Sequence, residues 1–343
     1  PSENDPAEMI CRVFYAQGCV GKLAALLHAA RAASRGEGHS PYPIAHGHPR
    51  KCDRIQAVLW SHYEWRIWIM ELKRNVYKKL VEWKEKNTGH VLELKGARQV
   101  GKTYILKKFG RENFPKMVYI NMAEQTGKDF LRCLSIATEW SPGTPRPEKP
   151  LRKALALFDS AFSDDGDTVV IIDEVQESAQ VYNQIRTFAR EFQAYVIVTG
   201  SYLGKTIHPE FFLPAGDMDH MIMETLAFDE FLDVFGAREL YETIDLFGKG
   251  KSEDYEKLMG YYEVYQKIGG YPAVVVSYAE EKNPDKCFCL IKDLMDLFAN
   301  ESKRYFEDIV DVNLFQKLFN AVALLMIQEK QGIRDLVSEL SKI

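Results

Sequence analysis

The sequence predicts an α/β protein, in which a parallel sheet of about five strands with helices on both faces is followed by an all-helical part. The first observation is that short apolar runs alternate with segments of helical spacing between residues 91 and 226. Strands that alternate with helices pair in parallel, because each helix returns the chain to the same edge of the sheet. The second is that after Leu226 the apolar residues recur almost only at helical spacing.

Length and composition allow two domains. The chain has 343 residues, no apolar run long enough to predict a membrane span, and a net charge of −5. That charge does not support nucleic-acid binding, so DNA would have to bind at a local basic patch. The six cysteines are few and irregularly spaced. They favour reduced thiols and a cytoplasmic location over a disulfide framework.

The first 69 residues differ from the rest of the chain. They hold five of the eight histidines and three of the five tryptophans, and glycine and proline interrupt them repeatedly between 36 and 49. We therefore expect 1–69 to be a poorly ordered or non-native extension. The composition then predicts one domain at 70–226 and a helical domain at 227–343.

Patterning places the individual elements. The run at 168–172 is continuous and mostly β-branched, as expected of a strand buried on both faces. The expected strands are 91–94, 117–121, 168–172, 195–198 and 221–223. Helical spacing predicts helices at 71–86, 102–109, 130–136, 151–162, 181–192, 227–235, 239–247, 253–268, 285–306, 314–327 and 333–340. The Gly-Gly-Tyr-Pro sequence at 269–272 is expected to stop a helix and form a turn.

The first strand leads into the pattern G-x-x-x-x-G-K-T, which is a P-loop. Its glycines let the backbone wrap around a phosphate, so that successive N–H groups point inward. The lysine places a charge on the terminal phosphates and the threonine hydroxyl can bind Mg²⁺. The residues expected to surround the nucleotide are Gly96, Ala97, Arg98, Gln99, Val100, Gly101, Lys102 and Thr103.

Two later strands end in residues that fit the same chemistry. The apolar run at 168–172 is followed by Asp173 and Glu174. We expect Asp173 to hold Mg²⁺ with Thr103, and Glu174 to polarise the attacking water as a general base. The next strand ends at Thr199, followed by Gly200 and Ser201. Thr199 and Ser201 are expected to sense the γ-phosphate or to position water, so Glu174, Lys102, Thr199 and Ser201 form the expected catalytic set.

These motifs resemble a family. The segments 96–103, 172–176 and 199–204, followed by 213–217, 226–231 and 269–272, are similar to those of prokaryotic AAA-type ATPases of the ASCE class, which carry a C-terminal helical domain of unknown function. The resemblance implies ATP and Mg²⁺ as ligands, hydrolysis, and a P-loop strand near the centre of the sheet. It also implies a winged-helix-like end to the helical domain. The chain stops in the first helix of that segment, so we expect a truncated protein.

One position departs from the family pattern. Asp217 stands where relatives often carry a basic residue after the Pro-x-Gly turn, which suggests slow hydrolysis or another donor. An arginine supplied by a second copy of the chain or by a partner protein is equally compatible with the sequence. Within the chain the candidate donors are Arg98, Arg186, Arg190 and Lys205.

The expected function is ATP binding and hydrolysis that drive a conformational change of the helical domain. Two alternatives stay open. One is a nucleotide-gated switch or scaffold with little turnover. The other is a DNA-associated ATPase module whose effector domain lies outside this chain. No membrane partner is expected.

Overall fold

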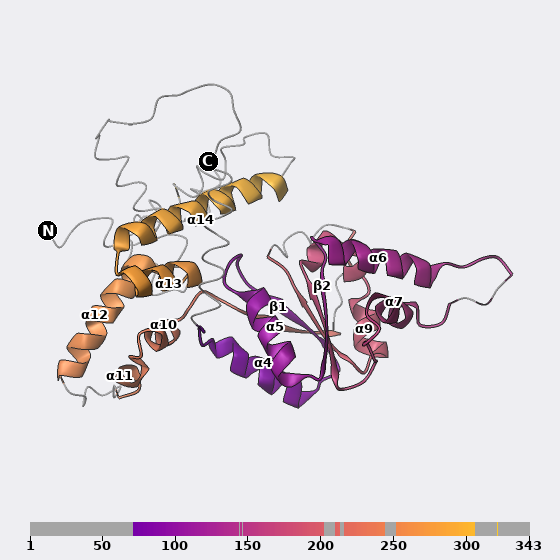
Figure 1. Ribbon diagram of the computed structural model, residues 1–343, viewed down its shortest axis with the longest axis horizontal. Coiled ribbons are helices and arrows are strands. Elements are labelled where there is room, and N and C mark those ends of the chain that lie inside the picture. Colours follow the sequence, from indigo (N-terminus) through magenta and orange to yellow (C-terminus); the bar gives the residue numbers. More distant parts are fainter. Residues whose placement is uncertain are drawn as a thin grey trace, which may run out of the picture. The chain divides into compact units, whose positions relative to one another are not determined.

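The structure, a computed structural model, describes residues 71–305 apart from a few short gaps, and also describes Ala321 (Figure 1). The gaps are 144, 146, 202–209, 213–215 and 244–251. The expectations for 1–69, for the helices at 314–327 and 333–340 and for a truncated winged-helix-like end therefore lie outside the described residues.

Five parallel strands form one sheet, as the sequence predicts. The strands are β1 (Val91–Lys95), β2 (Lys116–Asn121), β3 (Thr168–Asp173), β4 (Tyr195–Thr199) and β5 (Met218–Ile222). Their order is β2-β3-β4-β1-β5, so β1 lies between β4 and the edge strand β5. Because every pairing is parallel, all five strands end at the same edge.

The fifth strand lies at 218–222, not at the expected 221–223. The expected position followed the apolar run Met-Ile-Met. An edge strand is covered less than a central one and tolerates polar residues, and here Asp219 and His220 each find a partner on a neighbouring segment. Asp219 accepts a hydrogen bond from Thr88, and His220 pairs with Glu93 on β1.

Helices cover both faces of the sheet. On one face lie α4 (Asn75–Lys86) and α5 (Lys102–Asn113). The other face carries α6 (Gln125–Thr138), α7 (Pro150–Phe158) and α9 (Ile185–Glu191). The core on this second face joins Val118, Ile120, Val170, Ile172, Val196 and Val198 of the strands to Phe130, Leu134, Leu155 and Phe188 of the helices.

Several expected helices are shorter than predicted, and the one expected at 71–86 begins only at Asn75. The helix expected at 151–162 ends at Phe158, because the Asp159 carboxylate accepts the backbone N–H of Ala161 and closes a turn instead. The helix expected at 181–192 is preceded by a 3₁₀ turn, η1 (Val175–Glu177), and split into α8 (Ala179–Tyr182) and α9. Between α8 and α9, the Asn183 side-chain amide oxygen accepts the Phe212 N–H at 2.7 Å.

The described residues after the sheet are helical, as expected. The helices are α10 (Phe228–Val234), α11 (Arg238–Glu242), α12 (Ser252–Ile268), α13 (Pro272–Glu281) and α14 (Pro284–Tyr305). α13 is absent from the sequence prediction, which stopped at a turn around Pro272. Proline suits the first position of a helix, where its missing N–H has no intrahelical partner, so the same residue begins α13.

The chain forms two compact units. Residues Arg74–Glu224 hold the sheet and its flanking helices, and the other unit consists, among the described residues, of 71–73 and the residues from Thr225 on. The domain limits 70–226 and 227–343 stay predictions, since a compact unit need not fold alone. No helix among the described residues is both long and apolar enough to span a membrane.

The core of the first unit gives a stability prediction. Phe130 on α6 is fully buried and packs edge-on against Phe158, with ring centroids 5.9 Å apart, whereas Ile136 on the same helix is 51% exposed. We expect Phe130→Ala to lower the free energy of unfolding by about 3–5 kcal/mol, because it leaves a cavity. Ile136→Ala should change it by less than about 1 kcal/mol. Urea denaturation of both variants measures this, and equal losses would contradict the packing described.

Candidate functional site

The predicted motifs meet at one edge of the sheet. The loop 96–101 follows β1, Asp173 ends β3, and Thr199 ends β4. In the sheet β4 lies between β3 and β1, so these carboxyl ends are adjacent. Parallel α/β sheets bind ligands outside the carboxyl ends of their strands.

The loop from β1 to α5 has the backbone that its glycines allow. Gln99 and Gly101 have left-handed φ values of 64° and 98°. At Gly96 a Cβ atom would lie 2.2 Å from the carbonyl oxygen of Met223, so only glycine fits this close approach. The loop ends at the first turn of the 12-residue helix α5, whose N–H groups and dipole favour an anion.

Lys102 is held inside this loop. Its side chain is buried, with the residue 6% exposed, and Nζ donates to the carbonyl oxygens of Gly96 at 2.8 Å and Ala97 at 2.9 Å. Burial lowers the pKa of Lys102 to about 8, although the carboxylates of Glu174 and Asp173 act in the opposite direction. The loop therefore holds a buried amine whose charge is sensitive to a nearby anion.

The Asp173 carboxylate accepts three hydrogen bonds. Its carboxylate Oδ2 accepts the hydroxyl of Thr103 at 2.6 Å and that of Tyr119 at 2.9 Å, and Oδ1 accepts the N–H of Glu174 at 2.9 Å. Burial, and then the charge of Asp173, raise the pKa of Tyr119, so its hydroxyl stays protonated and donates. The ammonium of Lys107 lies 3.7 Å from the centre of the Tyr119 ring. The expected pair Thr103 and Asp173 is thus brought together, with Tyr119 added.

Glu174 is turned toward the end of β4. Its φ is 50°, a left-handed value that is uncommon for a residue with a side chain and is found most often at functional sites. Oε2 accepts the Ser201 hydroxyl at 2.9 Å and the Ser201 N–H at 3.3 Å. The Gln176 amide donates to the same oxygen. Glu174 and Ser201 therefore lie together, as the expected catalytic set requires.

Thr199 is placed differently from Ser201. It is fully buried, and its hydroxyl donates to the carbonyl oxygen of Leu94 on β1 at 2.7 Å. This bond uses the only hydroxyl proton of Thr199 inside the sheet. The geometry favours a structural role for Thr199, tying β4 to β1, over the γ-phosphate sensor expected from the sequence.

The structure places Asp217 away from the P-loop, and the expected influence of this position on hydrolysis stays a prediction. Asp217 precedes β5, and its carbonyl oxygen accepts the N–H of Val91 at the amino end of β1. The P-loop follows the opposite end of that five-residue strand, roughly 15 Å away at about 3.3 Å per residue. The guanidinium groups of Arg186 and Arg190 donate to the Asp217 carboxylate at 3.1 and 3.0 Å and lower its pKa. Lys205 lies outside the described residues.

Sequence motifs missed two residues that contact the site, Tyr119 and Gln176. Tyr119 lies on β2, where Asn121 pairs in register with Asp173 of β3. The sequence shows only that a tyrosine lies close to the end of a strand. Its contact with Asp173 could be inferred only if β2 were known to lie beside β3. Gln176 belonged to a quoted motif but had no assigned role.

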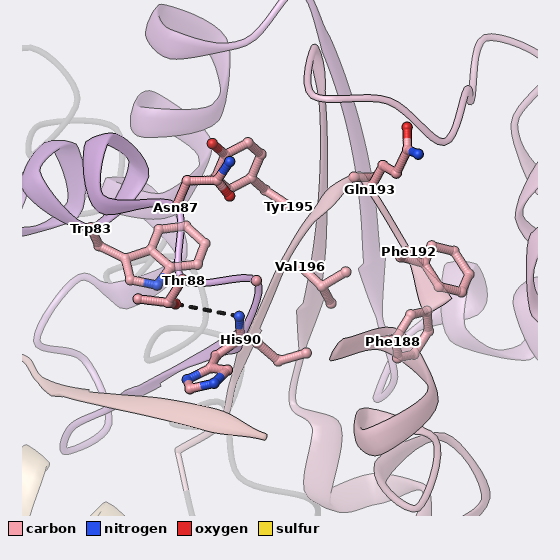
Figure 2. A pocket seen from close by; sticks show the side chains of 12 residues that line it. Trp83, Asn87, Thr88, His90, Phe188, Phe192, Gln193, Tyr195 and Val196 are labelled. Carbon is pink, nitrogen blue, oxygen red and sulfur yellow. Dashed lines mark hydrogen bonds between the residues drawn. The ribbon is translucent and has the colours of Figure 1, made fainter. Parts of the chain in front are cut away.

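A cavity of about 210 Å³ lies at the amino edge of the sheet (Figure 2). Aromatic side chains line it from α4, α9 and β4, and polar residues that precede β1 complete its wall. These residues include Trp83, Thr88, His90, Phe188, Phe192 and Tyr195. The Asp219 carboxylate holds two of these lining residues in position, because it accepts hydrogen bonds from the Thr88 hydroxyl at 2.7 Å and from the Trp83 indole at 3.2 Å. The cavity thus lies at the other end of β1 from Lys102 and takes no part in the site described above.

Fold and site together define a P-loop nucleotide-binding protein. A parallel sheet of order 2-3-4-1-5 carries a glycine-rich loop after its β1 strand, and the acidic end of β3 meets the helix that follows the loop. This combination is typical of proteins that bind a nucleoside phosphate at the carboxyl edge of the sheet.

A family model matches part of the chain. Residues 88–232 match the model described as an AAA domain. No curated protein matched the sequence.

Among solved structures, the Walker-type ATPase PABY2304 of Pyrococcus abyssi is similar at 16% identity and a TM-score of 0.42, covering 69% of this chain and 77% of that one. PCH-2 of C. elegans is similar at 14% identity and a TM-score of 0.36, with 68% and 71% covered. A single-residue variant of RuvB of Thermotoga maritima has 16% identity and a TM-score of 0.34, with 64% and 68% covered. Scores this low support no functional conclusion.

The buried lysine gives a pH prediction. A bound phosphate keeps Lys102 charged, while without it the pKa of Lys102 is about 8. Affinity for ATP should therefore be constant below pH 8 and fall by up to about tenfold for each unit above it, because binding then requires uptake of a proton. Calorimetric titrations at pH 7 to 9.5 measure this. Lys102→Arg should bind with a flat profile, and a decline of equal slope in that variant would assign the titration to another group.

Proposed function

We propose that the chain binds Mg²⁺-ATP at the carboxyl edge of the sheet and hydrolyses its β-γ phosphoanhydride bond. The observation that supports this best is the pairing of two acidic residues with distinct partners. Asp173 shares its carboxylate with Thr103 of the P-loop helix, and the next residue, Glu174, is held by Ser201 at the end of β4. This arrangement supports the roles proposed for the two acids, Asp173 as a ligand of the metal and Glu174 as the group that polarises a water molecule.

Phosphate binding is the role of residues 96–103. The N–H groups of the loop and of the first turn of α5 provide donors, and Lys102 provides the charge. The Nζ atom of Lys102 would exchange the carbonyl oxygens of Gly96 and Ala97 for phosphate oxygens. Because a charged oxygen is a stronger acceptor than a carbonyl, this exchange favours the nucleotide. Arg98 lies in the same loop and adds a second positive charge.

The donor set fits Mg²⁺. Thr103 and Asp173 present a hydroxyl and a carboxylate 2.6 Å apart, and Mg²⁺ is usually bound by one or two such oxygens together with phosphates and water. Among the described residues no group of three or more His, Cys, Asp or Glu side chains could hold a metal, so the phosphates would complete the shell. When bound, the ion neutralises the charge that develops on the phosphate oxygens.

Glu174 is the proposed general base. Its carboxylate would accept a proton from the water that attacks the γ-phosphorus, while Lys102 stabilises the phosphate charge. Ser201 and Gln176 orient the carboxylate through one of its oxygens, which leaves Oε1 for the water. Ser201 is therefore the expected positioning residue, and Thr199 maintains the spacing of β4 and β1.

An arginine from outside the chain is a further part of this proposal. Arg186 and Arg190 are bound to Asp217 at the amino edge, away from the P-loop. A second copy of the chain or another protein would supply the charge in trans. The change of nucleotide state would then drive a conformational change of the helical part. A cytoplasmic location also remains a proposal.

One alternative is favoured by a specific observation. The carboxylate of Glu174 accepts three hydrogen bonds from Ser201 and Gln176, and Lys102 is engaged by its own loop. If ATP did not release these bonds, the chain would act as a nucleotide-gated switch or scaffold with little turnover. No observation on the described residues favours the DNA-associated module.

A variant without the proposed base distinguishes ATP hydrolysis from the nucleotide-gated switch. Glu174→Gln should leave ATP affinity within about threefold, because no phosphate contact is lost, and should lower kcat by about 10²–10⁴-fold. Steady-state phosphate release with Mg²⁺ measures the effect. Glu177→Gln, three residues further on, is the matched control and should retain turnover.

Retained turnover in Glu174→Gln would mean that another group acts as base. Absence of turnover in the parent chain, with ATP still bound, would instead favour the switch. Loss of ATP binding by the parent chain would remove the proposal altogether.

The Tyr119 hydroxyl gives a second test. Tyr119→Phe removes one donor from Asp173 and should raise the Mg²⁺ concentration for half-maximal turnover by about tenfold, because partners of a metal ligand tune its affinity. Tyr195→Phe is the control, since the Tyr195 hydroxyl donates to the backbone carbonyl oxygen of Lys84 at the other edge of the sheet. Equal Mg²⁺ dependence in both variants would show that Tyr119 does not position Asp173.

A further inference from the structure

We propose that Arg74 is a positioning residue that couples the P-loop to the junction between the two units, with Thr225 as the pivot. The inference rests on the proposed function, because it requires that ATP bind at the P-loop. It concerns how that binding reaches the helical unit, which neither the fold nor the family match assigns.

Arg74 joins two backbone carbonyls that are far apart in the sequence. It is 9% exposed, and its guanidinium donates to the Val100 oxygen at 2.7 Å and to the Glu224 oxygen at 2.6 Å. Val100 is a P-loop residue, and Glu224 is the last residue of the first unit. The planar guanidinium has several donors in a fixed geometry, so it can hold both carbonyls at once, which an ammonium group does poorly.

The segment next to Glu224 also packs on the P-loop. Met223 continues the pairing of β5 with β1, since its N–H donates to the Lys95 oxygen at 2.7 Å. Its own carbonyl fills the place where Gly96 would carry a Cβ atom, and its methyl group lies 3.6 Å from the corresponding position of Gly101. Residues 223–224 therefore touch the loop at both of its glycines and, through Arg74, at Val100.

The helical unit holds the chain just beyond this segment. The Leu226 N–H donates to the Gly270 oxygen at 2.7 Å, and the Leu226 oxygen accepts the Tyr265 hydroxyl at 2.8 Å. A Cβ atom on Gly270 would lie 2.1 Å from that same oxygen, so the contact requires glycine. The sequence Gly269-Gly270, between α12 and α13, is thus an anchor for Leu226 as well as the end of a helix.

These contacts leave one residue between two fixed points. Glu224 is attached to the P-loop and Leu226 to the helical unit, so at this crossing Thr225 must absorb any change of direction. The chain's other crossing between the units lies between Lys73 and Arg74, next to the proposed coupling residue itself. Hinges of this kind are short segments whose backbone dihedrals take up the motion. When Lys102 exchanges its loop carbonyls for phosphate, the loop is reorganised, and Arg74 passes the shift of Val100 to Glu224.

Hydrogen exchange tests the coupling in the Glu174→Gln background, where ATP stays bound. Residues 221–228 should exchange at least about fivefold more slowly with Mg²⁺-ATP than without it, in the range of allosteric coupling. Arg74→Ala and Arg74→Lys should lose this response while residues 96–103 still respond to saturating ATP. Arg152→Ala, which removes an ion pair with Asp164 on the same unit, should keep both responses.

The outcomes separate this inference from the proposed function. Failure of the parent chain to bind ATP would overturn both. If both Arg74 variants bind ATP and residues 221–228 still exchange more slowly with it, the coupling alone is overturned. The coupling is also overturned if ATP binds to the parent chain without slowing the exchange of residues 221–228. If the Arg74 variants fail to fold, Gly270→Ala applies the test from the other side. It should displace Leu226 and abolish the junction response with the P-loop response intact, and a retained response would again overturn the inference.

Discussion

The site depends on the parallel pairing of three adjacent strands. β1 pairs with β4 and β4 with β3, so the hydrogen bonds of the sheet fix where each strand ends. The glycine-rich loop, the paired acids and Ser201 then meet without any contact among their side chains having to create the arrangement. Thr199 reinforces this order by bonding to the carbonyl of Leu94 across the β1–β4 pair.

The buried polar side chains at these strand ends form hydrogen bonds within the chain, because a buried polar group without a partner costs free energy. Asp173 is 2% exposed and is compensated by two hydroxyls and a backbone N–H rather than by a cation. Lys102 is compensated by two carbonyls. These neutral partners are weaker than charged ones, so Mg²⁺ and phosphate can compete for the same two residues. The polar groups of the site thus have partners within the chain that the proposed ligands could replace.

Much of this architecture could be predicted from local sequence. Four of the five strands were found within a residue or two, because buried β-branched runs have few other interpretations, and the P-loop follows from its spacing. The edge strand β5 was displaced because its polar residues depend on neighbours that are distant in sequence. The location of Asp217 was hidden for the same reason: its motif position says nothing of the neighbouring strand, whose Val91 lies beside it at the amino edge. Tyr119 became visible only when β2 was seen beside β3.

Arg74 shows what local reasoning leaves out. Nothing in the sequence around it differs from an ordinary helix start, and its two acceptors, Val100 and Glu224, are backbone atoms that carry no residue signature. Any side chain at those two positions would present the same carbonyl, so only the three-dimensional path of the chain shows the contact. A residue that acts on backbone can thus couple two parts of a protein without forming a motif. Arg74 holds both the loop proposed to bind ATP and the segment that precedes the junction, and this double contact is the basis for the coupling proposed above.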